Sequence, residues 1–239
     1  MGRLAMHAPL SPDDRAALLE LPHASRFYET GSFLVREGDA AGVCSVLVSG
    51  LGYRHKVSGE GQRQIVSMHV PGEMFDLQQL YLEHSDCSLQ TSMRSEVATM
   101  PRTALRRLAH DRPAVADALV AMVLVELATA REWLLNIGRR DSYMRIAHFL
   151  CELAVRLKSG GLPPGQGYEL PMTQEQLGDA VGLTAVHISR TLKRLVRDGL
   201  VAYGKSGVSI PDWEKLVRAA DFNSRYLHLD THPATLPAQ

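Results

Sequence analysis

The chain has 239 residues, of which 45% are hydrophobic and 22% are charged, with 26 basic and 26 acidic side chains. A chain of this length can bury a substantial core and is expected to form one or two domains. The net charge of zero argues against a surface that binds nucleic acid over its whole extent, so any contact with DNA must come from a local patch.

The sequence carries few signs of membrane insertion, export or metal binding. No run of about 18 uninterrupted apolar residues occurs, which argues against a membrane partner, and the N-terminal residues lack the pattern of a signal peptide. Cys44, Cys87 and Cys151 are odd in number and widely spaced, which fits neither a disulfide framework nor a zinc or iron–sulfur motif. We therefore expect a reduced, cytoplasmic protein without a metal site.

The first part of the chain predicts a short helix followed by strands. Ser11 is a helix cap, Pro12 suits the first helical position, and Asp14 is the acid expected three residues after the cap. Between about residues 27 and 101, short apolar runs alternate with glycine-containing turns. This density of strands and turns indicates a closed antiparallel β-roll or jelly roll.

A short helix over residues 102–111 precedes a long helix that runs from Pro113 to about Gly138 and has two apolar stripes. One stripe repeats in steps of three and four, as in a coiled-coil seam that pairs with a second copy. The other covers the first half, so the helix is expected to be buried against both the β-roll and a partner. A core helix of a monomer is the alternative. The seam comprises Val120, Val123, Leu127, Ala130, Leu134 and Ile137, and the other stripe comprises Val115, Ala118, Leu119, Met122 and Val125.

A break at residues 138–140 indicates a hinge and a domain boundary. Asp141 or Ser142 then caps a helix that continues to about Lys158. Glycine and proline dominate residues 159–167, which predicts a flexible loop, and the tail after Arg225 is also expected to be flexible.

Two helix starts lie close together between Met172 and Leu192. Thr173 and Gln176 form a capping-box pattern, Gly182 can end the first helix, and Thr184 caps the second. Two short helices joined by a tight turn form a helix-turn-helix, whose second helix can enter the DNA major groove. The inward apolar positions are Leu177, Val181, Ile188, Leu192, Leu195 and Val196.

Four outward side chains remain at the start of the second helix. They offer an arginine fork for guanine, a hydroxyl, and apolar groups for a thymine methyl, which is the mixture that a base reader needs. An ordinary helical hairpin with a solvated basic face is the alternative. Residues 200–203 and 208–210 flank a glycine-rich turn and predict a β-hairpin, or wing, before a last helix capped by Asp212. The four side chains are Ala185, Val186, Ser189 and Arg190, and the same helix continues with Lys193, Arg194 and Arg197.

This order of parts resembles the CRP/FNR superfamily of bacterial transcription regulators over roughly residues 10–220. The motifs that carry the resemblance are Arg36-Glu37-Gly38-Asp39, Val48-Ser49-Gly50, Val70-Pro71-Gly72-Glu73, Arg145-Ile146-Ala147 and the stretch 182–200. The resemblance implies an α+β fold with an N-terminal antiparallel β-roll, which is a cyclic-nucleotide-binding-like jelly roll, a long dimerisation helix and a C-terminal winged helix-turn-helix. The corresponding domains are residues 1–112, 113–140 and 141–222, followed by a flexible tail over residues 223–239.

The resemblance also implies a function. It predicts a homodimer, not an enzyme, that binds a palindromic operator in double-stranded DNA and works with RNA polymerase. A small-molecule effector or a redox signal at the β-roll would reposition the second helices. Ala185, Val186, Ser189 and Arg190 match the base-reading positions, with Ser189 and Arg190 as in the FNR branch and Val186 where the family often has glutamate. The expected phosphate contacts are Gln174, Thr184, His187 and Lys193.

The sensor motifs of the two best-known branches are missing. The cyclic-nucleotide branch has a Gly-Glu pair and, about ten residues later, an Arg-Ser pair, whereas residues 75–78 and 83–88 contain neither and Asp86 would repel a phosphate. No cysteine precedes Cys44, so an iron–sulfur cluster is not expected either. The effector pocket is expected between the roll and the long helix, near Arg54, Arg63 and Arg131.

Three alternatives stay open. One is a haem- or redox-responsive regulator of the same fold, and another is a jelly-roll enzyme that depends on a metal. The third is an interaction module whose winged helix contacts protein instead of DNA.

Overall fold

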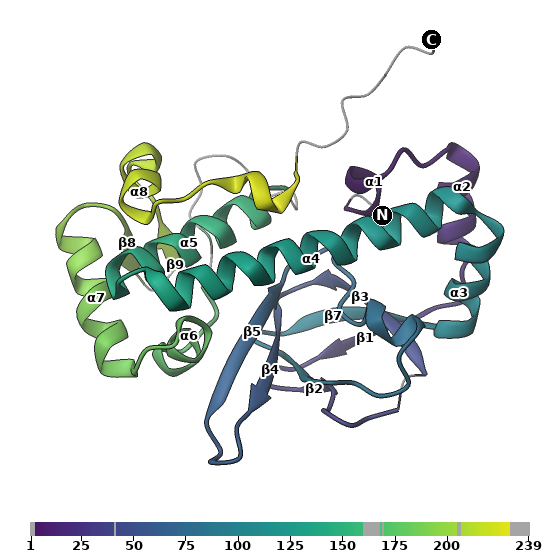
Figure 1. Cartoon of the computed structure of the whole chain (residues 1–239), viewed down its shortest axis with the longest axis horizontal. Helices are drawn as coiled ribbons and strands as arrows, with labels where there is room; N and C mark the ends of the chain where they lie inside the picture. Colours follow the sequence, from purple (N-terminus) through teal and green to yellow (C-terminus); the bar gives the residue numbers. More distant parts are fainter. Residues whose placement is uncertain (1–2, 41, 160–167, 169, 205–206, 230–239) are drawn as a thin grey trace, which may run out of the picture.

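The computed structural model describes residues 3–40, 42–159, 168, 170–204 and 207–229. It confirms the predicted architecture and the order of its parts (Figure 1). A β-roll lies on one side of a single long helix, α4, which runs across the whole molecule, and a helical domain with a small hairpin sits at the far end of that helix.

The N-terminal helices are α1 (Leu4–His7) and α2 (Pro12–Leu19). The predicted cap is present, because the Ser11 hydroxyl accepts a hydrogen bond from the Asp14 amide and the Asp14 carboxylate accepts one from the Ser11 amide. These two bonds satisfy amide groups that a helix start otherwise leaves without partners.

The roll consists of two antiparallel sheets, with strand orders β1-β7-β3 and β2-β6-β4-β5. Leu47, Phe75, Leu89 and Val97 are buried between them. Gly50 has a φ of 91°, and a Cβ there would lie 2.2 Å from Oγ of Ser95, so only glycine fits this turn. The bounds are β1 (Ala24–Tyr28), β2 (Phe33–Val35), β3 (Val43–Ser49), β4 (Gly52–Val57), β5 (Arg63–His69), η1 (Leu77–Leu80), β6 (Ser88–Thr91) and β7 (Ser95–Pro101).

Helices α3 (Arg102–Asp111) and α4 (Pro113–Arg139) follow the roll. One stripe of α4 is buried in a core shared with α1, α3 and η1, and comprises Val115, Ala118, Leu119 and Met122. The predicted seam lies elsewhere on the helix and is largely exposed, with 50% of Leu127 and 73% of Leu134 accessible to solvent. Both apolar stripes therefore exist, and only one is covered within a single chain.

By length and composition, α4 could also cross a membrane. Its most apolar stretch has a mean hydropathy of 1.8, and 22% of that stretch is buried. In the structure, however, one face packs on the roll and Glu126 forms an ion pair with Arg54 of β4. Within a single chain, α4 is therefore covered on one face and open on the other.

The C-terminal domain begins after a break in the helix. The Asp141 carboxylate accepts hydrogen bonds from the amides of Tyr143 and Met144, so Asp141 is the cap of the next helix. Residues from α5, α6, α7 and α8, including Leu150, Leu177, Ile188 and Leu216, share one core. The bounds are α5 (Ser142–Ser159), α6 (Gln174–Val181), α7 (Ala185–Arg197), β8 (Ala202–Gly204), β9 (Gly207–Ser209), α8 (Trp213–Ala220) and η2 (Ser224–Leu227).

Two expectations about this domain need correction. Val196 is 44% exposed and does not belong to the buried stripe of α7. Residues 223–229, expected to be the start of a flexible tail, pack against the helices instead, because Leu227 is buried and the Tyr226 hydroxyl donates to Glu152. The predicted loop at residues 160–167, the tip of the wing and residues 230–239 lie outside the described part of the chain.

Candidate nucleic-acid interface and cavity

The turn between α6 and α7 is built by short-range contacts. Thr173 and Gln176 form the predicted capping box, in which the two distances from donor nitrogen to acceptor oxygen are 3.1 and 2.9 Å. Gly182 ends α6 in the left-handed conformation, with a φ of 66°. The sequence reasoning missed Gly178, where a Cβ would lie 2.3 Å from the Leu183 carbonyl oxygen. The absence of a side chain at Gly178 therefore lets the turn pass this close to α6.

Helix α7 has one buried and one exposed face. Its buried side chains are Ile188, Thr191, Leu192 and Leu195. The four side chains proposed to read bases lie together at the start of the helix, where Ala185, Val186 and Arg190 are exposed and Ser189 is half-buried. The helix forms the outer edge of the C-terminal domain, at the end of the molecule farthest from α2 and α3 (Figure 1).

The side chains proposed to contact phosphates surround this face. Gln174 is exposed at the first residue of α6, and Lys193 is exposed on α7. Thr184 caps α7 by accepting a hydrogen bond from the His187 amide, and its hydroxyl lies 3.2 Å from Nδ1 of His187. The N-terminus of a helix with a polar cap favours an anion such as a DNA phosphate.

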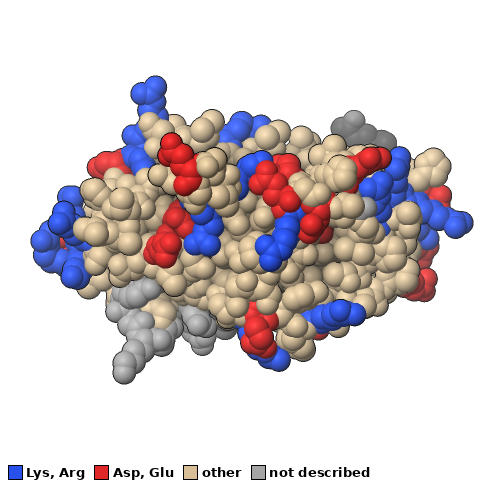
Figure 2. Space-filling view, turned by 90° about the horizontal axis from the view of Figure 1, so that it is seen from below, with Lys and Arg blue, Asp and Glu red and all other residues tan. Residues whose placement is uncertain are grey.

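The basic residues of α7 differ in how far they are neutralised. Arg194 lies over the ring of Tyr143 and 3.8 Å from Asp198, and Arg197 lies 3.5 Å from the same carboxylate. Within the described part of the chain, Arg190 and Lys193 have no carboxylate partner. Figure 2 shows Lys and Arg side chains gathered at both ends of the molecule, and the left end is the one that carries α7. The positive charge expected of a local DNA-binding patch is therefore present on this helix.

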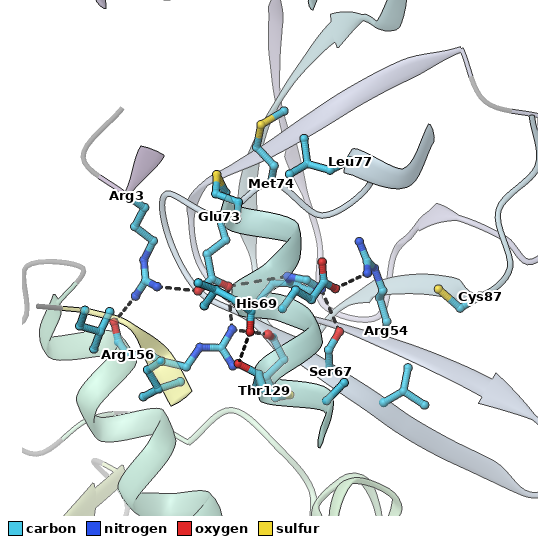
Figure 3. Close-up of a pocket in the computed structure, with 18 of the residues that line it drawn as sticks. Arg3, Arg54, Ser67, His69, Glu73, Met74, Leu77, Cys87, Thr129 and Arg156 are labelled. Carbon is cyan, nitrogen blue, oxygen red and sulfur yellow. Dashed lines mark hydrogen bonds and ion pairs between the residues drawn. The ribbon is translucent and has the colours of Figure 1, made fainter. Parts of the chain in front are cut away.

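A cavity of about 230 Å³ lies where the roll, α4, α5 and the C-terminal segment meet (Figure 3). Its apolar wall includes Met68, Met74, Leu77, Met122, Val125 and Leu227. Figure 3 shows Arg3 and Arg156 on either side of Glu73, with Arg54 and Cys87 toward the other end. The volume is below the range of about 300–1,000 Å³ that is usual for pockets that hold drug-sized ligands.

Of the three arginines expected at an effector pocket, one lines the cavity. Arg54 reaches it from β4, where it pairs with Glu126 of α4 and donates to Gln78 at 3.1 Å. Arg63 instead pairs with Asp179 of α6 at 2.7 Å, so it joins the roll to the helix-turn-helix. Arg131 is exposed on α4 and does not line the cavity. The structure therefore places Arg63 and Arg131 away from this cavity, and only Arg54 remains a candidate to contact a ligand within it.

A buried chain of charges, which the sequence reasoning missed, runs from the cavity into the C-terminal domain. Glu73 accepts hydrogen bonds from Arg3 at 2.6 Å and from Arg156 of α5 at 2.7 Å. Burial alone would raise the pKa of Glu73, but Arg156, His69 and Arg3 hold this pKa well below its usual range. The side chain is therefore a carboxylate, and it links the turn after β5 to α5 of the C-terminal domain.

The chain continues on α5. Arg156 also donates to Glu152 at 2.9 Å, and the oxygens of Glu152 accept hydrogen bonds from Trp133 of α4 at 2.9 Å and Tyr226 of η2 at 2.8 Å. Glu152 is 2% exposed, so this carboxylate depends on its three donors in place of water. The network thus joins the roll, helices α4 and α5 on the two sides of the hinge, and the C-terminal segment.

The cysteines do not fit an iron–sulfur cluster. Such a cluster is held by four protein ligands, typically thiolates, and this sequence has three cysteines, which lie in three separate places. Burial raises the pKa of Cys44 to about 12, of Cys87 to about 11 and of Cys151 to about 12, so all three are protonated thiols. Among the described residues, no group of three or more His, Cys, Asp or Glu side chains could hold a metal ion.

The residues around the cavity do not fit haem either. The cavity is smaller than the sites of ordinary organic ligands, and its buried imidazole is engaged. Nε2 of His69 lies 3.0 Å from the Ser67 hydroxyl, and Nδ1 lies 3.7 Å from Glu73. Burial lowers the pKa of His69, so the ring is held neutral within the protein.

Comparisons with known proteins agree with this geometry. Residues 25–112 match the family described as "Cyclic nucleotide-binding domain", and residues 144–219 match the "Crp-like helix-turn-helix domain". The nitrogen fixation regulation protein FixK of Rhizobium meliloti is 31% identical over 183 residues, which cover 76% of this chain and 79% of that protein. The transcriptional activator protein FnrL of Cereibacter sphaeroides is 28% identical over 215 residues, which cover 88% of this chain and 86% of that protein.

A solved structure is also similar. The structure of FixK2 from Bradyrhizobium japonicum superposes with a TM-score of 0.76 and 27% identity. The match covers 83% of this chain and 98% of that structure, so the likeness extends over the roll, the long helix and the C-terminal domain together.

Proposed function

Because this chain belongs to the CRP/FNR family of DNA-binding transcription regulators, we propose that it binds a palindromic operator as a homodimer, with α7 of each copy in the major groove. Its relatives FixK and FnrL are a regulation protein and a transcriptional activator, and the chain is likewise a regulator and not an enzyme. RNA polymerase is the partner expected of such a regulator, and the cytoplasm is its expected location.

The observation that carries this proposal is the exposed start of α7. Ala185, Val186 and Arg190 are exposed there beside the half-buried Ser189. Arg190 and Lys193 have no carboxylate partner among the described residues. The planar guanidinium of Arg190 can donate two hydrogen bonds to guanine, whereas Gln174, Thr184, His187 and Lys193 can contact phosphates. Ala185, Val186 and Ser189 complete the surface that would face the bases.

The dimer is proposed from the uncovered stripe of α4. Val120, Val123, Leu127 and Leu134 repeat at coiled-coil spacing and are between 44% and 73% exposed. Pairing through this stripe with a second copy would remove it from water. The two-fold axis of such a dimer implies two half-sites about one helical turn apart.

The sensor ligand is proposed to be a small molecule that enters the cavity beside Arg54. A cyclic nucleotide is a poor candidate, because Glu126 already neutralises Arg54 and the walls contribute Asp86 and Glu73. The protonated, buried cysteines argue against a thiol redox signal. Neither haem nor an iron–sulfur cluster fits the residues present.

Selection of bound sequences from random DNA tests the proposal. We expect one palindromic sequence to be enriched, and Arg190→Ala to weaken binding to it by about 1–3 kcal/mol while relaxing the preference at one base pair of each half-site. Arg107→Ala is a matched control, because this arginine is exposed on α3, far from α7. Equal affinity of the Arg190 variant and the unaltered protein would contradict the docking of α7, and the absence of any enriched sequence would contradict the function itself.

A further inference from the structure

One aliphatic side chain stands among the candidate base readers. Val186 is 60% exposed, although it lies on a helix whose other face is fully packed. It precedes the buried Ile188 by two residues and the buried Leu195 by nine. At 3.6 residues per turn, these separations place Val186 on the side of α7 directly opposite the core. Its exposure therefore follows from the direction in which it points and not from incomplete packing.

Val186 also heads the basic stripe of the helix. Arg190, Lys193 and Arg197 follow it in steps of four, three and four, so all four residues share one exposed face. Thr184 caps the helix, which makes Val186 the second helical residue. In a helix-turn-helix, the N-terminal residues of the second helix contact base edges. The positive charges of Arg190, Lys193 and Arg197 would attract the DNA backbone and so bring Val186 close to the bases.

The neighbours of Val186 leave it as the apolar contact of this face. The ring of His187 turns back toward the cap, where Nδ1 lies 3.2 Å from the Thr184 hydroxyl. Ser189 is half-buried, and Ala185 presents a single methyl group. Val186 itself has no side-chain donor or acceptor, so it can neither accept from the amino group of cytosine nor donate to guanine.

We propose that Val186 selects thymine, by packing its methyl groups against the thymine 5-methyl at a base pair next to the one that Arg190 contacts. The thymine methyl is the apolar group that base pairs expose in the major groove. Val186 and Arg190 lie about one helical turn apart, with about 6 Å between them along the axis, which corresponds to one or two base-pair steps. The proposal rests on the proposed function and adds the base that one position of the operator requires.

Replacement of thymine by uracil tests it, because the two bases differ only in the methyl group. Each thymine of the selected operator is replaced in turn by deoxyuridine, and the dissociation constant is measured by fluorescence anisotropy. For the unaltered protein, we expect one thymine per half-site at which the replacement weakens binding about fourfold, the value of one buried methyl or methylene group. For Val186→Ala, the loss at that thymine should fall below twofold.

Two further measurements distinguish the contribution of Val186 from that of Ala185. Ala185→Gly should keep the full loss at the same thymine, because this variant leaves the valine in place. An operator with cytosine at the same position should bind the unaltered protein weakly, and one with 5-methylcytosine should bind it more tightly. For Val186→Ala, the operators with cytosine and 5-methylcytosine should bind with equal affinity. Because Val186 is exposed, its substitution should leave the folded domain intact, which the melting temperature can verify.

The result that overturns the proposal is equal affinity for thymine and uracil at every position of the half-site. The proposal would also be overturned if replacing thymine by uracil weakened the binding of Val186→Ala as much as that of the unaltered protein. Both results require a protein that has already selected an operator, so they are distinct from the failure of the proposed function, in which the unaltered protein enriches no sequence at all.

Discussion

At the residue scale, Asp76 shows how a single buried carboxyl group can make stability depend on pH. The side chain is 2% exposed and accepts hydrogen bonds from the amide of Ser45 at 2.7 Å and from its hydroxyl at 3.0 Å. Burial raises the pKa of Asp76 from 3.8 to about 6, and the two hydrogen bonds offset only part of this shift. At neutral pH, the folded protein must therefore hold a carboxylate where a neutral group is preferred.

The sign of the effect follows from the raised pKa. Well below pH 3.8, the pKa of the unfolded chain, the carboxyl is neutral in both the folded and the unfolded chain, and the contribution of Asp76 to stability is at its largest. As the pH rises from about 4 through 6, the unfolded chain loses its proton first, and about 3 kcal/mol of unfolding free energy is lost.

We expect Asp76→Asn to remove this part of the pH dependence. Its amide oxygen can still accept from the Ser45 amide, so the variant should gain about 3 kcal/mol relative to the unaltered protein between pH 4 and pH 7. Urea denaturation at a series of pH values measures the difference. If the unfolding free energies of the two proteins changed with pH in parallel, Asp76 would not titrate in this interval.

At the element scale, the C-terminal segment from Asp221 to Leu229 acts as a strap over the hinge. Asp221 and its backbone carbonyl oxygen lie 3.5 and 3.3 Å from Nη2 of Arg140, beside the break between α4 and α5. The ring of Phe222 lies 5.1 Å from that of His148 on α5, and Leu227 is buried against α4 and the cavity. The segment lies beyond residue 219, where the match to the helix-turn-helix family ends.

Tyr226→Phe tests the energetic weight of this strap. The variant removes the hydroxyl that donates to the buried carboxylate of Glu152, and a hydrogen bond to a charged group contributes about 1.5–3 kcal/mol. We expect a loss of that size in the free energy of unfolding. Tyr81→Phe is the control, because Tyr81 is 70% exposed and should lose less than about 0.5 kcal/mol. Equal losses in the two variants would mean that the strap contributes nothing specific.

The elements also show what the sequence could predict. The helix starts at Ser11, Thr173, Thr184 and Asp212 were predicted correctly, because a cap is a contact over two or three residues. The two stripes of α4 were predicted for the same reason, since periodicity is local. The strap was missed, because its packing depends on a surface that distant helices form.

At the scale of the whole molecule, the sequence predicted the order of the parts but not the contacts between them. Arg63 and Asp179 are 116 positions apart, and Glu73 and Arg156 are 83 positions apart. No local sequence pattern marks such pairs. The two residues of each pair can be identified only from the folded structure, in which distant segments of the chain meet. The candidate base readers were easier to find, because all four lie within two turns of one helix.

The uncovered stripe of α4 gives a prediction at this scale. Leu134 is 73% exposed in the single chain, so Leu134→Arg should fold normally but place two charges in the proposed dimer interface. We expect a monomer by analytical ultracentrifugation and binding to single half-sites only. Leu19→Arg changes a leucine of α2 that is 63% exposed and should remain a dimer. A dimeric Leu134 variant with unaltered operator affinity would place the interface elsewhere.

The pair of Glu73 and Arg156 has a consequence for how the roll and the DNA-binding domain can separate. Each group has a second partner in its own part of the molecule, because Glu73 also accepts from Arg3 and Arg156 also donates to Glu152. Parting the two domains would therefore break one ion pair without leaving either charge alone in the protein interior. We expect the cost of separation at this joint to be that of a single contact, exchanged for water, and not that of two unpaired buried charges.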